Sequence, residues 1–480
     1  MSLASRAASS AVFLGASTVI NIGIGFVSSI VLARLLQPND FGTFALVVTL
    51  FAFADIRVKL QLDQKFLRDQ DDSAEYLDAY FTLNFALACV SLIVVSGGAV
   101  IAVILNRTDL AICLFAFSAL GLIDPLTSTI RVSIEKKVAF RAISLIQLLA
   151  AVTLFVVTLI TAWLGLGLWS LLLGTGASTL VSAGLFWRIA PRRPKWRVDM
   201  PLARAFLGYG LRYGLVYAVS AIILTQFDNF IIGLMMGTYA LGFYDRAYRT
   251  SLWPTLLVSA ALGRISLPAY AQLQNEPDRL SRAFSIVLWL VLTCATPIAL
   301  LVLVTAPELV PILYGEKWLP SVPILQVLAA FAVCRPLWDN MVSILIATKR
   351  PGQMARLAFI QAVVLIVLAV PLTQLLGSVG TAMSVGVAFL ISAVFLFYFG
   401  GKYLSVALLK NIGLPLFNNL ATVMIYYVLV AMLPLGSLAL WVRLGMEAIL
   451  FLGVYVVLTG LTSRQTVAER ARYILQLARG

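Results

Sequence analysis

Residues 79–105 read AYFTLNFALACVSLIVVSGGAVIAVIL, and this stretch decides the fold class. It runs for 27 residues without a single charged side chain. As a helix that rises about 1.5 Å per residue, it is long enough to cross the roughly 30 Å hydrocarbon core of a bilayer. The stretch therefore predicts a membrane-spanning helix.

Similar stretches recur along the whole chain of 480 residues. Hydrophobic residues make up 61% of the sequence and charged residues 12%, whereas an average soluble domain is about half apolar and a quarter charged. No single soluble fold could bury this much apolar surface, and the composition also excludes disordered and collagen-like proteins. We expect an all-α polytopic membrane protein.

The apolar stretches predict about fourteen transmembrane helices with short connections. We place them at residues 10–36, 41–56, 79–105, 110–131, 141–163, 166–188, 206–236, 241–264, 283–305, 320–348, 355–375, 378–401, 412–433 and 437–461.

The basic residues predict the orientation of these helices. With a cytoplasmic N-terminus, 27 of the 35 Lys and Arg residues fall in inner segments, and only Arg107 and Lys317 fall in outer loops. Cytoplasmic loops of membrane proteins carry such an excess, so both termini are expected in the cytoplasm. The net charge of +14 then reflects attraction to anionic lipids of the inner leaflet and predicts no nucleic-acid partner.

Two short segments suggest an internal repeat. Residues 35–44 and 235–244 each join two predicted helices and end in hydrophobic-Gly-x-aromatic, at an offset of 200 residues. A weaker pair, residues 164–167 and 376–380, forms Gly-containing hairpins. The alternative is chance similarity between apolar sequences. A true repeat predicts two parallel six-helix lobes around a midplane cavity whose access alternates.

The repeat and the charge pattern together predict the domain organisation. We expect an N-terminal six-helix lobe, a cytoplasmic linker rich in Pro and Arg, a C-terminal six-helix lobe, two additional transmembrane helices and a cytoplasmic tail. Their predicted ranges are 1–190, 191–205, 206–402, 403–462 and 463–480.

Arginines inside the predicted spans are candidates for substrate binding. A charge at the bilayer centre is costly, so it is expected to face a cavity or a partner. Arg246 and Arg249 lie three residues apart on one helix face, and two guanidinium groups suit a phosphate or diphosphate. The alternative is that both reach the lipid headgroups. Arg212 and Arg335 are the other candidates within spans.

Carboxylates inside the spans are candidates for ion coupling. Asp124 and Asp228 could bind a proton or cation, because a buried carboxylate changes charge when its environment changes. The alternative is a structural hydrogen bond to a neighbouring helix. Asp339 lies four residues after Arg335, as Glu447 does after Arg443, so internal neutralisation is an alternative role for these pairs.

Several chemistries are absent from the sequence. It contains no histidine, which excludes histidine-based catalysis and metal ligation, and no GxxxxGK[ST] motif for nucleotide phosphates. We therefore expect no catalytic residue, no metal and no cofactor apart from a coupling proton or sodium ion.

The motifs resemble those of Wzx-type polysaccharide flippases, within the multidrug/oligosaccharidyl-lipid/polysaccharide exporter superfamily. Residues 242–249, GFYDRAYR, resemble the family's GYYSRAYR, and residues 32–42, LARLLQPNDFG, resemble its LARLLxPxDFG opening. Residues 266–270 and 313–320 also match, so the resemblance covers nearly the whole chain.

The resemblance implies a V-shaped two-lobe bundle with a cation-lined cavity, and two extra helices beside a groove for a polyprenyl tail. It implies translocation of undecaprenyl-diphosphate-linked oligosaccharides to the outer leaflet of the bacterial inner membrane, for O-antigen, capsule or exopolysaccharide. Polymerase and chain-length or export proteins are the protein partners that it suggests. Arg34 joins the candidate diphosphate contacts through its motif, while Asp245 replaces a small polar residue and could weaken binding or serve coupling.

Two other functions compete with this one. A cation or drug antiporter of the same superfamily predicts an acidic cavity, but arginines within the spans rival the acids in number. A membrane enzyme for polysaccharide synthesis predicts a sizeable extramembrane loop, which the predicted spans do not leave.

Overall fold

The computed structural model describes residues 3–479 except residues 70, 72, 138–139, 212–214, 404–408 and 435–437. Every regular element in these described residues is helical, as predicted. The α-helices are α1 (Leu3–Leu35), α2 (Pro38–Ala54), α3 (Ile56–Leu60), α4 (Leu62–Arg68), α5 (Ala74–Ile104), α6 (Thr108–Gly121), α7 (Asp124–Lys136), α8 (Phe140–Trp163), α9 (Leu168–Ile189), α10 (Met200–Tyr209), α11 (Leu215–Met235), α12 (Gly237–Gln272), α13 (Pro277–Leu290), α14 (Thr296–Tyr314), α15 (Val322–Phe331), α16 (Cys334–Ala347), α17 (Pro351–Leu376), α18 (Ser378–Tyr403), α19 (Leu414–Met432) and α20 (Leu440–Arg479). The π-helices η2 (Val291–Ala295) and η4 (Leu409–Gly413) and the 3₁₀-helix η3 (Glu316–Ser321) complete the described elements.

Twelve helical segments in the described part of the chain are long and apolar enough to cross a membrane. The other two predicted spans coincide with α2, which is apolar but has only 17 residues, and with α12, which has 36 residues. The polytopic class is therefore confirmed, while the count of fourteen spans stays a prediction.

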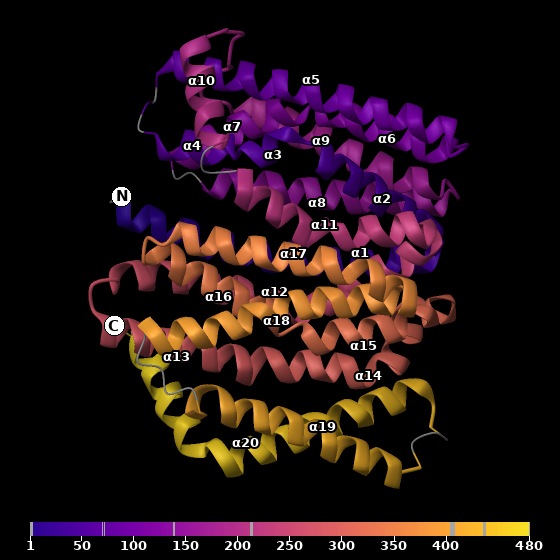
Figure 1. Cartoon of the computed structure of the whole chain (residues 1–480), viewed down its shortest axis with the longest axis vertical. Coiled ribbons are helices and arrows are strands. Elements are labelled where there is room, and N and C mark those ends of the chain that lie inside the picture. The colour runs from indigo at the N-terminus through magenta and orange to yellow at the C-terminus, as the bar shows by residue number, and fades with distance from the viewer. Residues whose placement is uncertain are drawn as a thin grey trace. The chain divides into compact units, whose positions relative to one another are not determined.

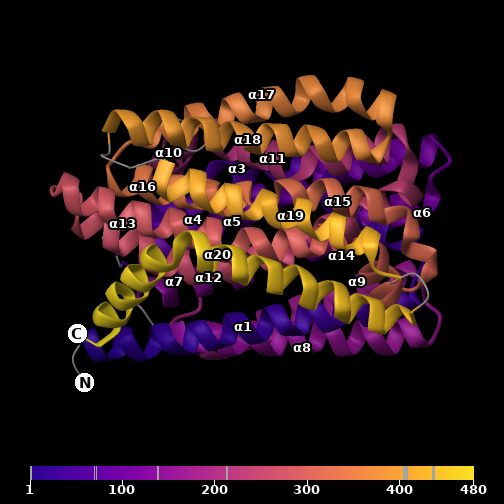
Figure 2. The same cartoon turned by 90° about the horizontal axis from the view of Figure 1, so that it is seen from below.

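The chain forms two compact units, residues 1–245 and 246–480, and the boundary lies inside α12. In the first unit α8 packs between α1 and α9, α5 packs along α6, and α11 packs on α2 (Figure 1). In the second unit α17 packs along α18, α15 and α16 contact α18, and α20 contacts both α14 and α19 (Figure 2).

In the described part of the chain, turns interrupt two of the predicted spans. The span at 110–131 divides into α6 and α7 around Leu122–Ile123, and the span at 320–348 contains a break between α15 and α16 at Ala332–Val333. Pro125 and Pro336 lie just after the breaks, and proline lacks the N–H that would continue the helical hydrogen bonds. Each break is next to a charged residue, Asp124 or Arg335.

The segment after Asp55 also differs from the prediction of a simple connection. It forms α3 and α4, which are separated by Gln61 in a left-handed conformation with φ of 48°. Leu62 and Phe66 of α4 are buried in a cluster with Tyr80 of α5 and Phe206 of α10. Helices α4, α5 and α10 therefore pack together around a hydrophobic cluster.

The repeat segments at 35–44 and 235–244 contact each other reciprocally within the first unit. A Cβ atom built on Gly42 would lie 1.7 Å from the carbonyl oxygen of Thr238, and one built on Gly242 would lie 1.9 Å from that of Pro38. The Thr238 hydroxyl also donates to Asn39 Oδ1 at 2.6 Å. Because residues 38 and 42 match 238 and 242 at the offset of 200, the contact has the symmetry that an internal repeat predicts.

We expect Gly42→Ala to destabilise the protein by about 1–3 kcal/mol, since the new methyl group would force two backbones apart. Thermal unfolding in detergent measures this effect. Gly97→Ala is the matched control, because a Cβ atom at Gly97 in α5 meets nothing within 4 Å. Equal melting temperatures for the two variants would contradict this account of the contact.

Candidate functional site

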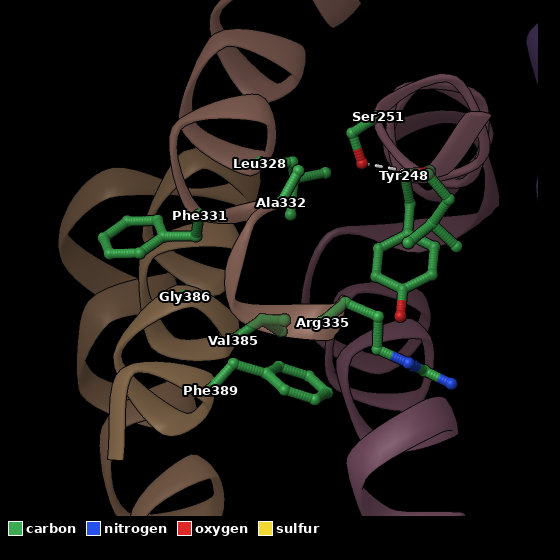
Figure 3. Close-up of a pocket in the computed structure, with 10 residues that line it drawn as sticks. Tyr248, Ser251, Leu328, Phe331, Ala332, Arg335, Val385, Gly386 and Phe389 are labelled. Atoms are coloured by element: carbon green, nitrogen blue, oxygen red, sulfur yellow. Dashed lines mark hydrogen bonds between the residues drawn. The ribbon is translucent and has the colours of Figure 1, made fainter. Parts of the chain in front are cut away.

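The second unit contains a pocket lined by α12, α15, α18 and the first turn of α16. Arg335 is the charged residue that lines it, and its side chain is 37% exposed. Tyr248 and Ser251 of α12 contribute hydroxyl groups, and Phe389 of α18 contributes an aromatic ring. Figure 3 shows the Tyr248 hydroxyl and the Arg335 guanidinium on the same side of the pocket.

Local sequence features build this pocket. The break before α16 places Arg335 at the start of a helix. Gly386 of α18 allows Phe331 at the end of α15 to approach, because a Cβ atom on Gly386 would lie 2.1 Å from Phe331 Cδ2. The Arg335 Cζ atom lies 5.8 Å from the centre of the Phe389 ring, which supports a cation–π contact.

The pocket combines groups suited to a phosphorylated sugar. A guanidinium group binds phosphate oxygens through two parallel hydrogen bonds, and hydroxyl groups both donate to and accept from sugar hydroxyls. Asp339 limits the positive charge, because its Oδ1 lies 3.7 Å from Arg335 Nε. This pair has the i, i+4 contact that the sequence predicted, but both side chains remain more than one-third exposed.

The first unit has a separate charged cluster around Arg57. Its guanidinium donates through Nε and Nη2 to both oxygens of Asp55, at 3.0 and 2.8 Å, and through Nη1 to Asp124 at 3.0 Å. The Arg57 and Asp55 side chains are 8% and 6% exposed, and that of Asp124 is 55% exposed. Burial acts to lower the pKa of Arg57, but the hydrogen bond and charge of Asp55, with the charge of Asp124, raise it above its usual value.

The sequence did not identify Asp55 and Arg57 as members of one charged cluster with Asp124. Arg57 is one of the 27 basic residues that the charge pattern predicts in inner segments, because it follows the apolar stretch of 41–56. The closeness of Asp55 and Arg57 was a weak signal, but no local pattern indicates a contact with Asp124, which lies 67 residues further along the chain.

Arg246 is not in the pocket. It is 3% exposed, and its Cζ atom lies 5.7 Å from the Tyr314 ring centre and 5.6 Å from the Trp318 ring centre. Arg249, three residues later, is exposed, as is Arg34 near the end of α1. Arg212 lies outside the described residues. Of the five candidate arginines, the structure thus places Arg335 in the pocket.

The four candidate aspartates lie in different surroundings. Asp228 is 1% exposed and accepts a hydrogen bond of 2.8 Å from the Tyr244 hydroxyl. Asp245, 6% exposed, is close enough to Asp228 to act on it electrostatically. Asp124 and Asp339 pair with Arg57 and Arg335. Among the described residues, no group of three Cys, Asp or Glu side chains is arranged to hold a metal ion.

Comparison with solved structures identifies the fold. The lipid II flippase MurJ in an inward closed conformation superposes with a TM-score of 0.75 at 14% identity, covering 95% of this chain and all of the flippase. An inward-facing multidrug resistance MATE family transporter gives 0.60 at 14% identity, covering 79% of this chain and 93% of the transporter. Because flippases and drug transporters share this fold, the fold alone does not decide the function.

Comparison of sequences identifies the family. The lipopolysaccharide biosynthesis protein WzxC of Escherichia coli K12 is 25% identical over 451 residues, which cover 92% of this chain and 90% of WzxC. Residues 31–323 match the family model described as "Polysaccharide biosynthesis protein". The chain therefore belongs to the polysaccharide biosynthesis protein family, as a Wzx-type member.

Proposed function

We propose that this protein is a flippase that moves a polyprenyl-diphosphate-linked oligosaccharide from the inner to the outer leaflet of a bacterial inner membrane. The likeness to WzxC and to the MurJ fold supports a transporter of a lipid-linked glycan rather than an enzyme. O-antigen, capsule or exopolysaccharide repeat units are the proposed substrates, and polymerase and chain-length or export proteins are the proposed partners.

The pocket around Arg335 carries this proposal. Arg335 supplies a phosphate ligand, Tyr248 and Ser251 supply sugar ligands, and Phe389 offers an apolar face to a sugar ring. A cation-binding antiporter needs an acidic site instead. No carboxylate is among the described residues that line this pocket, and Asp339 close to it pairs with Arg335.

The proposed transport cycle is alternating access. The cytoplasm-facing state captures the diphosphate and sugar while the lipid tail stays in the bilayer, and the lobes then rock to expose the site outward. Both termini are proposed to be cytoplasmic, as the basic loops indicate. Proton or sodium binding at a buried carboxylate would return the carrier, and Asp228 with Asp245 is the candidate pair in the first unit.

Deleting the gene should abolish the surface polymer and leave the lipid-linked repeat unit in the cytoplasmic leaflet, because synthesis of the unit precedes its translocation. Labelled sugar followed by quantification of both products measures this outcome. Expression of the full chain in the deletion strain should restore the polymer.

Two results of this experiment would refute the proposal. Unchanged polymer would favour an antiporter or a different glycan. Loss of the lipid-linked unit itself would favour a biosynthetic enzyme.

A further inference from the structure

A second buried charged cluster lies in the second unit, at one end of α14 and α20. Arg443 of α20 contacts Glu308 of α14 through Nη2 at 2.7 Å and Glu447 of α20 through Nε at 2.9 Å. The Glu308 and Glu447 side chains are 4% and 1% exposed, while that of Arg443 is 34% exposed. Glu308 lies six residues before the end of α14, which corresponds to roughly 9 Å of helix.

The geometry brings the two carboxyl groups together. The Nε and Nη2 atoms form one edge of a single guanidinium group, so the carboxyl groups bound there lie side by side and interact directly. Two ionised carboxylates beside one arginine would leave a net charge of −1 in the buried cluster. Like charges this close in an apolar site repel each other, whereas one added proton makes the cluster neutral.

An independent observation points to the bound proton. The Glu447 Oε2 atom is buried and has no hydrogen-bond partner among the described residues. A buried carboxyl oxygen without a donor carries a large desolvation cost. A proton on either glutamate, shared with the neighbouring carboxyl group, would give this oxygen a hydrogen bond.

The surrounding helices add few other titratable groups. Tyr426 of α19 interacts with both glutamates and lies within hydrogen-bonding reach of Glu447, while Tyr427 acts on Glu447 through its charge alone. Helix α15, which also packs on α14, contains no titratable side chain. The thiol of Cys294 in η2 acts on Tyr455 instead. The 3₁₀-helix η3, which also contacts α14, carries Glu316 and Lys317. The charged groups within the cluster itself are Glu308, Glu447 and Arg443.

We propose that Glu308 and Glu447 form a proton-binding site, which holds one exchangeable proton between two carboxyl groups beside Arg443 and drives transport. The coupling role rests on the proposed flippase function, and the proton site itself does not. Loss of the proton places a net negative charge between α14 and α20, so it weakens their packing. Proton binding is thereby linked to movement of α19 and α20 against α14.

Infrared titration of the purified full chain in lipid nanodiscs tests the site directly. The wild-type protein should show a carboxylic-acid carbonyl band that disappears as the pH rises. The pH-dependent carbonyl band should be absent from the spectra of the Glu308→Gln and Glu447→Gln variants. The Glu276→Gln variant, which changes an exposed carboxylate, is the control and should retain the band. Arg443→Gln should retain the band to higher pH, because removal of the cation disfavours ionisation.

The same preparations separate the site from the transport function. In proteoliposomes, Glu447→Gln should flip labelled lipid-linked oligosaccharide at a rate that responds less to an imposed proton gradient than the wild-type rate does. If no preparation flips the lipid while the infrared component is present, the proposed function fails and the proton site stands. A wild-type spectrum without the component, or its displacement by sodium at constant pH, would overturn the proton site.

Discussion

Replacing Arg335 with alanine should reduce the rate of lipid-linked oligosaccharide flipping by roughly 10- to 100-fold. The guanidinium is the cation that lines the pocket of the second unit. Hydrogen bonds to charged groups contribute about 1.5–3 kcal/mol, and each 1.4 kcal/mol corresponds to a factor of ten. The assay is the transfer of a labelled substrate across proteoliposome membranes that contain the purified variant.

Two further variants make this result specific. Arg335→Lys keeps the charge but loses the planar pair of donors, so it should recover only part of the rate. Arg279→Ala is the matched control, because Arg279 is 66% exposed and pairs with Glu276 at the start of α13. If the Arg335→Ala variant flips the substrate at the wild-type rate, the pocket is not the substrate-binding site.

Replacing Arg57 with alanine should destabilise the protein by about 3–5 kcal/mol, because it leaves the buried Asp55 carboxylate without its cation. The effect should exceed that of any exposed pair, for which about 0–1 kcal/mol is expected. Denaturant unfolding of the purified protein in detergent, followed by circular dichroism, measures the difference from the wild type.

A neutral replacement of the whole cluster distinguishes charge from packing. The triple variant Asp55→Asn, Arg57→Met, Asp124→Asn has no unpaired charge, so it should recover most of the lost stability. If the triple variant is no more stable than Arg57→Ala, the loss arises from packing and not from the unpaired carboxylate.

Hydrophobic stretches were sufficient to predict most of the helical fold. Of the predicted span 79–105, for example, residues 79–104 lie in α5, which extends from Ala74 to Ile104. The break before Asp124 was not predicted, because the flanking sequence is apolar enough to continue a helix. Pro336, in contrast, indicated a kink or helix end close to Arg335. What ends α6 and α15 is proline chemistry combined with tertiary contacts, such as that between Phe331 and Gly386.

The candidate site was predicted less well than the fold. The search for charges within spans selected Arg335, which lines the pocket. It also selected Arg246, which lies beside the rings of Tyr314 and Trp318. Sequence alone cannot separate these two cases, since both arginines lie within predicted membrane spans. The partners of Arg246 are about seventy residues away in the chain, and only folding brings them together.

The reciprocal contact of Gly42 and Gly242 limits how the two halves of such a protein can diverge. Each glycine faces a backbone carbonyl of the opposite repeat, that of Thr238 or Pro38, and not a side chain. A larger residue in place of one glycine therefore cannot be compensated by a smaller side chain in the other segment, because the contact is with the backbone. If the two segments arose by gene duplication, the sequences at this contact could not diverge independently. In a chimera that joins halves from different relatives, we expect misfolding to begin at this contact.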